Sequence, residues 1–366
     1  MLSEIIREKI REEGPISFHD FMEMCLYYPG EGYYTSPKEK IGKNGDFYTS
    51  ANVSGLFGAM IGRQLEEMWN LTGGKEFIVV EYGAGTGMLC HDILDYLKGN
   101  RKFYSRLTYC IIEKSPVMRE KEKSLLQEKV CWCNSIHELP AFTGCVLSNE
   151  VVDNFSVHRV MMRDVLMEIF VDYKEEGFTE VMKPATKELA TYFAELNVVL
   201  PEDFCTEINL EAIEWIKEIG NCLKKGYVLT IDYGFPSSKL YHPRRCNGTL
   251  LCYHKHTLND QLYKNIGEQD ITSHINFSAL SHWGYKNDLI PVGFTSQASF
   301  LVNLGWQDYL NKTLLQHGDN YQKLRQYSFL KYTLLLDMGQ KFNVFIQGKS
   351  IPGTKLKGVK DNIAVL

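Results

Sequence analysis

The pattern of apolar and polar positions predicts a helical start to the chain. Residues 3–13 and 17–28 both have the spacing of amphipathic helices. Residues 29–54 are rich in Gly, Pro, Lys and Tyr and have no period, which predicts a long loop. Helical spacing returns over residues 54–69. We therefore expect residues 1–70 to form a segment of helices and a loop that packs on the core that follows.

From residue 77 onward, short continuous apolar runs alternate with helical segments. Such runs are typical of strands that are buried on both faces of a sheet. We expect strands at residues 77–81, 107–112, 130–132 and 144–148, and again at 227–232. The alternation predicts a mostly parallel sheet with helices on both faces and right-handed crossovers. This core is expected to comprise residues 71–154 and 226–366.

Two segments interrupt the alternation. After Asp153, residues 159–183 have the pattern of a strand meander, and helices are expected near 187–197 and 207–223. The fold class is therefore α/β, with an inserted α+β region that we expect to cover the substrate. We place that region at 155–225 and a second, irregular insertion at 235–276.

Composition narrows the protein class. The chain has 366 residues, of which 23% are charged and 44% hydrophobic, as in globular proteins. A net charge of −5 gives no electrostatic case for nucleic acid, and no apolar run is long enough for a membrane span. Ten dispersed cysteines and a charged N-terminus indicate a reduced, cytoplasmic protein. No metal site is expected, because Cys131 and Cys133 lack a matching second pair.

The strongest local motif is a glycine loop between a predicted strand and a predicted helix. Gly83, Gly85 and Gly87 allow a tight turn and a close approach of ligand to the free N–H groups of the helix. Their spacing differs from that of the dinucleotide-binding loop. Glu81, just before the loop, would repel a pyrophosphate but suits a ligand with a sulfonium and an ammonium group. The loop therefore predicts S-adenosylmethionine as the cofactor.

Polar residues follow the next strands. Glu113 ends the second strand, where a carboxylate can accept both hydroxyl protons of a ribose, although a solvated strand-end acid is the alternative. Asn134 and Ser135 follow the third strand, where an adenine amine would be bound, and Asn149 ends the fourth. Because ligands of such sheets lie beyond the carboxyl ends of the strands, we expect all four at the cofactor.

Glu150 and Asp153 are the candidate catalytic residues. An arginine guanidinium stays protonated in proteins, so a carboxylate must hold it by charge-assisted hydrogen bonds. Both acids follow the fourth strand and suit that role, although Asp153 is about as well explained as a helix cap. Asp270 and His274 follow the second insertion and are candidates either for substrate binding or for anchoring the next helix.

Several motifs together resemble the MidA-type methyltransferases, the group that includes a mitochondrial complex I assembly factor with protein-arginine methyltransferase activity. The motifs are Gly14–Phe18, Tyr28–Tyr34, Gly45–Thr49, Leu56–Gly58, Glu81–Gly87, Ser148–Glu150, Ile231–Gly234, Gly248–Leu250 and Asp270–Thr272. The resemblance implies a Rossmann-like class I methyltransferase core with seven strands. It also implies that Gly45, Asp46 and Thr49 surround the cofactor together with the glycine loop.

The resemblance implies that the substrate is a protein, methylated on an arginine nitrogen. The chain departs from the family pattern at Asn154–Ser156 and at Asn276, both near the expected substrate face. Two alternatives therefore stay open: a non-catalytic assembly or binding factor on the same fold, and a nucleotide-cofactor oxidoreductase. A bacterial, cytoplasmic protein is expected, and its oligomeric state, monomer or homodimer, is open.

Overall fold

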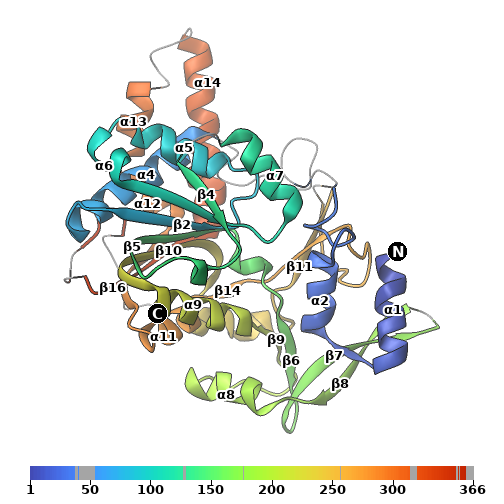
Figure 1. Cartoon of the computed structure of the whole chain (residues 1–366). Helices are drawn as coiled ribbons and strands as arrows, with labels where there is room; N and C mark the ends of the chain where they lie inside the picture. The colour runs from blue at the N-terminus through green and yellow to red at the C-terminus, as the bar shows by residue number, and fades with distance from the viewer. Residues whose placement is uncertain are drawn as a thin grey trace. The chain divides into compact units, whose positions relative to one another are not determined.

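The chain forms an eight-stranded sheet in the computed structural model (Figure 1). Seven of its strands lie side by side in one order, and the two-residue strand β14 (Ile275–Asn276) pairs with the end of β10 (Leu223–Phe235). The structure describes residues 1–37, 40, 54–126, 129–175, 177–255, 257–313, 320–351, 353 and 355–359. The chain divides into two units. We call Tyr48–Val151, Ile216–Tyr233 and Trp283–Leu366 the core unit. The remaining ranges, Met1–Phe47, Val152–Trp215 and Gly234–His282, are the insert unit.

The sheet of the core unit has the strand order β15-β16-β10-β5-β2-β3-β4. Its strands are β2 (Phe77–Tyr82), β3 (Leu107–Ile112), β4 (Val130–Cys133), β5 (Phe142–Asn149), β10 (Leu223–Phe235), β15 (Ile290–Ser296) and β16 (Phe342–Lys349). β16 pairs antiparallel with β10 and with β15, and every other pairing in this order is parallel. The prediction of a mostly parallel seven-stranded sheet is therefore confirmed.

Apolar helix faces complete the core of this unit. The helices are α4 (Gly55–Thr72), α5 (Met88–Leu97), α6 (Arg101–Arg106), α7 (Pro116–Leu125), α12 (Gln297–Asn303), α13 (Trp306–Thr313), α14 (Asn320–Lys331) and α15 (Met338–Lys341), with a short 3-10 turn η1 (Ile136–Glu138) and a π-helical stretch η4 (Tyr332–Asp337). Helices α9 (Leu210–Cys222) and α11 (Phe277–Tyr285) each begin in the insert unit and end in the core unit. Among the described residues, no helix is long and apolar enough to cross a membrane.

Small residues let α4 and α5 approach each other closely. A Cβ atom added to Gly58 would lie 2.5 Å from the Asp92 Cβ, and one added to Gly62 would lie 2.6 Å from the Tyr96 ring. Ser54 caps the start of α4 by accepting a hydrogen bond from the Leu56 N–H. Helix α4 therefore packs against α5, which begins directly after the glycine loop.

The insert unit contains two further sheets and its own helices. Its elements are α1 (Leu2–Glu13), β1 (Ile16–Ser17), α2 (Phe18–Tyr27), η2 (Val152–Asn154), β6 (His158–Met162), β7 (Leu166–Lys174), β8 (Gly177–Pro184), α8 (Lys187–Glu195), β9 (Cys205–Ile208), α10 (Ser237–Leu240), η3 (Pro243–Arg245), β11 (Leu251–His254), β12 (Thr257–Asn259), β13 (Asp270–Thr272) and β14 (Ile275–Asn276). One sheet has the order β1-β7-β6-β9 with β8 on β7, and the other is β12-β11-β13.

The insert unit departs from the predicted pattern in two places. The expected helix near 207–223 begins only at Leu210, because Cys205–Ile208 pairs with β6 as strand β9. The second insertion, expected to be irregular, contains the three-stranded sheet β12-β11-β13. The predicted meander over 159–183 is present as β6, β7 and β8.

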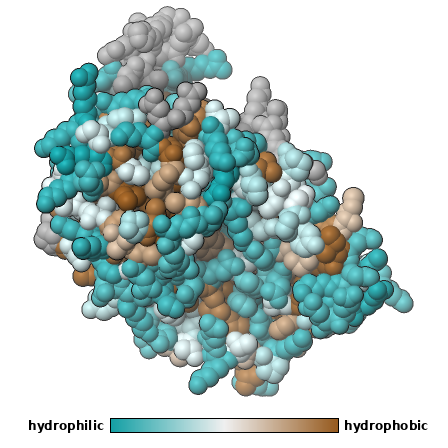
Figure 2. Space-filling view, in the orientation of Figure 1, coloured by the Kyte–Doolittle hydropathy of each residue, from teal (hydrophilic) through white to brown (hydrophobic). Residues whose placement is uncertain are grey.

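We expected residues 1–70 to form one segment, but they are divided between the two units. Helices α1 and α2 pack into an apolar cluster with the strands of the insert unit, in which Ile6 and Phe21 contact residues such as Val171. Helix α4 instead contributes Met60 to the cluster of the core unit. Hydrophilic residues cover most of the face shown in Figure 2, with apolar residues in smaller groups between them.

Candidate functional site

The glycine loop links β2 to α5 in a conformation that favours glycine. Gly83, Gly85 and Gly87 have φ values of 60°, 57° and 78°, in the left-handed region that side chains disfavour. A Cβ atom on Gly83 would lie 2.9 Å from a methyl group of Val151. The loop is therefore a tight turn without side chains at its glycines, and it ends at the N-terminus of helix α5, where no described side chain caps the first turn.

Glu113 is bound to this loop. Its carboxylate accepts hydrogen bonds from the N–H groups of Gly85 and Ser115, the latter at 2.7 Å. The Gly83 N–H donates to the carbonyl of Ile112 at 2.9 Å. Burial raises the pKa of Glu113, and the two N–H donors act against that rise. The structure thus brings together the predicted loop and the predicted ribose-binding acid.

Two more carboxyl groups belong to the same electrostatic cluster. Glu81 is 2% exposed and accepts a 2.7 Å hydrogen bond from the Tyr109 hydroxyl, and burial raises its pKa to about 7. Glu122 is fully buried and accepts a 2.8 Å hydrogen bond from the Trp132 indole. Burial, followed by the charge of Glu113, raises the pKa of Glu122 to about 8. Burial is the largest cause at all three groups, so the free protein disfavours the ionised form of each carboxyl group.

Sequence reasoning missed Glu122. It lies within five consecutive charged residues, 119–123, where the pattern predicts a solvated helix face. A faint signal exists, since Met118 stands four residues earlier on the same face of α7, and both side chains are buried. Helix α7 packs against the glycine loop, because a Cβ atom on Gly87 would lie 3.4 Å from the Cα of Glu122.

The residues after β4 form a local polar network. The Asn134 amide donates to Glu138 at 3.0 Å, and its oxygen accepts from Arg119 at 3.0 Å. Ser135 caps η1 by accepting the His137 N–H at 3.2 Å. Both predicted adenine-binding residues therefore hold the turn that follows β4, and their contact with a cofactor stays a prediction.

The end of β5 carries an unusual pair. Glu150 has a φ of 56°, and its N–H donates to the carbonyl of Ile231 at 3.0 Å. Asn149 donates its amide to Glu150 at 3.2 Å, and the Asn149 side-chain oxygen is buried with no hydrogen-bond partner among the described residues. Non-glycine residues in this strained region gather at functional sites. A carboxylate on a strained backbone, beside the Asn149 oxygen that has no partner among the described residues, indicates a ligand site at the carboxyl end of a central strand.

Asp153 lies in η2, on the insert unit. Its side chain is 3% exposed, and its carbonyl accepts the Ser273 N–H at 2.9 Å. η2 is thus joined to the segment that follows β13. Asp153 also raises the pKa of Tyr34, although burial of that hydroxyl is the main cause. Its proposed catalytic role stays a prediction.

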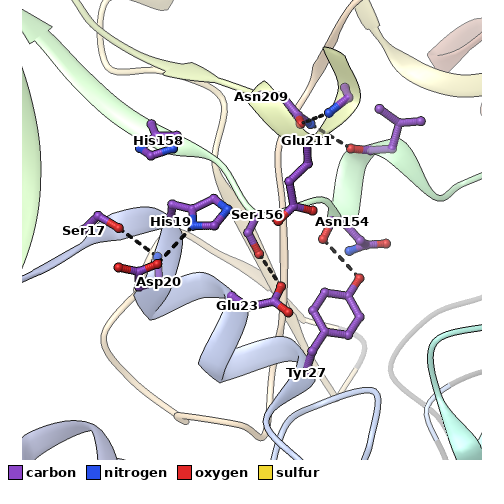
Figure 3. Close-up of polar contacts among 12 residues, drawn as sticks. Ser17, His19, Asp20, Glu23, Tyr27, Asn154, Ser156, His158, Asn209 and Glu211 are labelled. Atoms are coloured by element: carbon purple, nitrogen blue, oxygen red, sulfur yellow. Dashed lines mark hydrogen bonds and ion pairs between the residues drawn. The ribbon is translucent and has the colours of Figure 1, made fainter. Parts of the chain in front are cut away.

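The unusual run after Asp153 is tied to helix α2 (Figure 3). The Tyr27 hydroxyl donates to the Asn154 carbonyl at 3.2 Å, and the Ser156 hydroxyl donates to Glu23 at 3.0 Å. The Asn154 amide donates to Asp270 at 3.0 Å. The side chains of Asn154 and Ser156 therefore have hydrogen-bond partners within the insert unit.

Asp270 and His274 are both buried within the insert unit. Asp270 is 3% exposed, and its two oxygens accept hydrogen bonds from Asn154 and from the Tyr34 hydroxyl at 3.0 Å each. The His274 N–H donates to the Thr249 hydroxyl at 3.0 Å. Burial lowers the pKa of His274 to about 4, so its ring is neutral at neutral pH. These contacts favour the anchoring alternative, and substrate binding by either residue stays a prediction.

The second departure, Asn276, is also buried. Its amide donates to the hydroxyls of Tyr192 and Tyr241 at 3.2 and 3.1 Å, and its oxygen accepts the Ala279 N–H at the start of α11. A small pocket of the insert unit is lined by Asn276, Tyr192 and Val152, among others. An aspartate here could not donate to either hydroxyl, so the asparagine sets the polarity of this pocket wall.

The residues of the core unit fit the expected cofactor. The glycine loop, Glu81, Glu113 and Glu122 lie together, and burial raises the pKa of each carboxyl group, so a sulfonium or an ammonium group nearby would favour their ionised forms. Gly45, Asp46 and Thr49, which we also predicted at the cofactor, lie outside the described residues.

Comparison with known proteins agrees with this chemistry. Residues 60–295 match the family described as "Putative S-adenosyl-L-methionine-dependent methyltransferase". A Burkholderia thailandensis protein, solved bound to S-adenosyl-homocysteine, is 30% identical with a TM-score of 0.85, over 98% of this chain and 94% of that one. The mitochondrial protein arginine methyltransferase NDUFAF7 of Homo sapiens is 26% identical over 96% of this chain and 83% of its own length. The Caenorhabditis elegans homolog is 27% identical over 94% and 85%. The predicted class I methyltransferase fold is thus confirmed.

Proposed function

The chain belongs to the S-adenosyl-L-methionine-dependent methyltransferase family that matches residues 60–295, and on that premise we propose that its methyl acceptor is an arginine nitrogen of a protein. Membership makes S-adenosylmethionine the cofactor, as the loop motif predicts. The relatives from Homo sapiens and Caenorhabditis elegans bear the name of protein arginine methyltransferases, which supports the acceptor.

The geometry of Glu150 is the observation that carries the proposal. Its backbone is in a region that costs of order 1–3 kcal/mol for a side-chain-bearing residue. Strain of that size persists when the surrounding structure enforces it, and here the bond from the Glu150 N–H to Ile231 holds the turn. The Glu150 carboxylate accepts the Asn149 amide at 3.2 Å, and the oxygen of the same amide has no hydrogen-bond partner among the described residues. A carboxylate and an amide oxygen together can accept several of the N–H donors of a guanidinium.

We assign roles to the other residues on the same basis. The glycine loop would accept the amino-acid end of the cofactor, and Glu81 would stabilise its positive charge. Glu113 would accept hydrogen bonds from the ribose, and Asn134 with Ser135 would contact the adenine. The bound cofactor supplies an electrophilic methyl group.

Glu150 would act on the acceptor. It holds the guanidinium by charge-assisted hydrogen bonds and so orients one nitrogen in line with the methyl group. The nitrogen that Glu150 orients would then accept the methyl group that the bound cofactor supplies. The methylated nitrogen would then have one excess proton, and we propose the Glu150 carboxylate as the acceptor of that proton.

The test separates cofactor binding from transfer. Glu150→Gln keeps the shape of the side chain but removes its charge, so we expect unchanged affinity for S-adenosyl-homocysteine and a loss of methyl transfer of about 10²–10³-fold. Glu120→Gln, on the exposed face of α7, is the matched control and should keep both properties. Full transfer activity in Glu150→Gln would contradict the role that we give to this residue.

A non-catalytic assembly or binding factor is the second candidate. It is favoured by the internal bonds of Asn154 and Ser156, which give the unusual run a structural purpose. In that case the wild-type chain would bind S-adenosyl-homocysteine but release none from S-adenosylmethionine with any protein acceptor. Turnover at low enzyme concentration would exclude it. Stabilisation by NAD or FAD without a response to S-adenosyl-homocysteine would instead support an oxidoreductase.

A further inference from the structure

Three cysteines gather on one face of the core sheet. Cys110 in β3 pairs in register with Cys131 in β4, and Cys133 stands two residues further along β4. Because side chains alternate along a strand, all three point to the same face. Their sulfur atoms lie within 4.8 Å of one another, and those of Cys110 and Cys131 are 2.6 Å apart.

The three thiols lie on the other face of β3 from the Tyr109–Glu81 bond, and Cys133 directly precedes Asn134, which we assign to the adenine. Tyr109 precedes Cys110 and therefore points to the opposite face, where it donates to Glu81. From the sequence, Cys131 and Cys133 form an isolated pair with no further ligand. The strand register supplies the third thiol, from a residue 21 positions away along the chain.

The surroundings of the three sulfur atoms favour a bound cation. Cys110 is 1% exposed and Cys133 is 8% exposed, so both sulfur atoms are shielded from water. A metal ion that binds such a group deprotonates its thiols and balances the charge of the resulting thiolates. Cys131 is only partly buried on the terminal strand of the sheet, which gives an ion a path of entry.

We propose that Cys110, Cys131 and Cys133 form a three-thiolate site for a soft d¹⁰ cation such as Zn²⁺. Sulfur is the donor that selects Zn²⁺ and Cu⁺ over Mg²⁺ or Ca²⁺. With Zn–S bonds of about 2.3 Å, the sulfurs of such a site lie about 4 Å apart, so Cys110 and Cys131 need only rotate away from each other. Each new metal–sulfur bond releases one proton from its thiol. The fourth position is left to water or to an exchangeable ligand.

The site predicts tight binding of one ion per chain. The full-length protein would be reduced, stripped of metal with a chelator and titrated with Zn²⁺ against a chromogenic chelator. A parallel titration with Cd²⁺ would be followed by its charge-transfer absorbance with thiolates. We expect one equivalent to bind in the wild type, and the affinity to fall by at least about tenfold in Cys110→Ser, Cys131→Ser and Cys133→Ser. Cys246→Ser, at an exposed free cysteine, is the matched control and should bind as the wild type does.

Two measurements keep the test decisive. Circular dichroism and the affinity for S-adenosyl-homocysteine show whether each variant folds. Cys131→Ser is the variant least able to disturb the fold, because Cys131 is the least buried of the three residues. Binding that survives in folded Cys131→Ser and Cys133→Ser would overturn the proposal. So would a reduced wild-type chain that binds no better than those variants, or a Cys110–Cys131 disulfide that forms in place of metal binding. The proposal does not depend on the identity of the methyl acceptor.

Discussion

Replacing Glu81 with glutamine should stabilise the cofactor-free protein at alkaline pH while weakening its affinity for the cofactor. The glutamine oxygen can still accept the hydrogen bond from Tyr109, so the substitution removes the charge and little else. Burial raises the pKa of Glu81 from 4.5 to about 7. At 1.36 kcal/mol for each pKa unit, ionising this group in the folded protein costs about 3 kcal/mol.

The sign of the effect follows from the protons that each state binds. Between pH 4.5 and about 7 the folded protein keeps a proton on Glu81 that the unfolded chain has released. Stability therefore falls as the pH rises through this range, and the full cost of about 3 kcal/mol is present above it. Glu81→Gln does not bear that cost. We expect its free energy of unfolding to exceed that of the wild type by up to about 3 kcal/mol at pH 8, and by little near pH 4.5.

Urea unfolding of the cofactor-free protein, followed by circular dichroism at both pH values, measures this difference. Calorimetric titration with S-adenosylmethionine supplies the other half of the test. A bound cation favours the charged carboxylate, so wild-type affinity should increase about tenfold for each unit by which the pH is raised, up to about pH 7. Glu81→Gln should lose both affinity and pH dependence. A variant that is less stable than the wild type at pH 8, or equally stabilised at both pH values, would refute the reasoning.

Three further substitutions test other parts of the account. Gly83→Ala would place a Cβ atom 2.9 Å from Val151 at a φ of 60°, so it should destabilise the chain by about 1–3 kcal/mol and weaken S-adenosyl-homocysteine binding, both measurable by thermal shift. Asn276→Asp removes the donor to Tyr192 and should cost about 1–3 kcal/mol of unfolding free energy without changing cofactor affinity; an unchanged midpoint in urea would contradict this. Ser54→Ala removes the cap of α4 and should cost about 1 kcal/mol in the same assay, and Ser54→Asp should restore it.

The strands and helices of the core unit could be predicted because their patterns are local. Strand β3 runs over Leu107–Ile112, as predicted, because a continuous apolar run identifies a strand buried on both faces. Ser115 and Pro116 likewise mark the start of α7, where the Ser115 hydroxyl accepts the Met118 N–H. Turn residues also identified the hairpins of the meander.

Features that depend on register or on distant partners could not be predicted. Cys110 meets Cys131 only because β3 and β4 pair in one particular register. Glu122 is buried because one of the charged positions of α7 faces the glycine loop. In a run of five charged residues, the sequence pattern does not show which position is buried. The packing partners of the N-terminal helices could not be predicted for the same reason. An amphipathic pattern shows which face of a helix is buried but not which sheet covers that face.

The central claim is that this chain transfers a methyl group from S-adenosylmethionine to arginine in a protein. The most direct measurement incubates cell lysate with the purified full-length chain and isotopically labelled S-adenosylmethionine, then identifies the labelled residue by mass spectrometry. We predict labelled methylarginine in a defined protein with the wild type, and none above background with Glu150→Gln. Label that appears only in small molecules, or on a residue other than arginine, would contradict the claim.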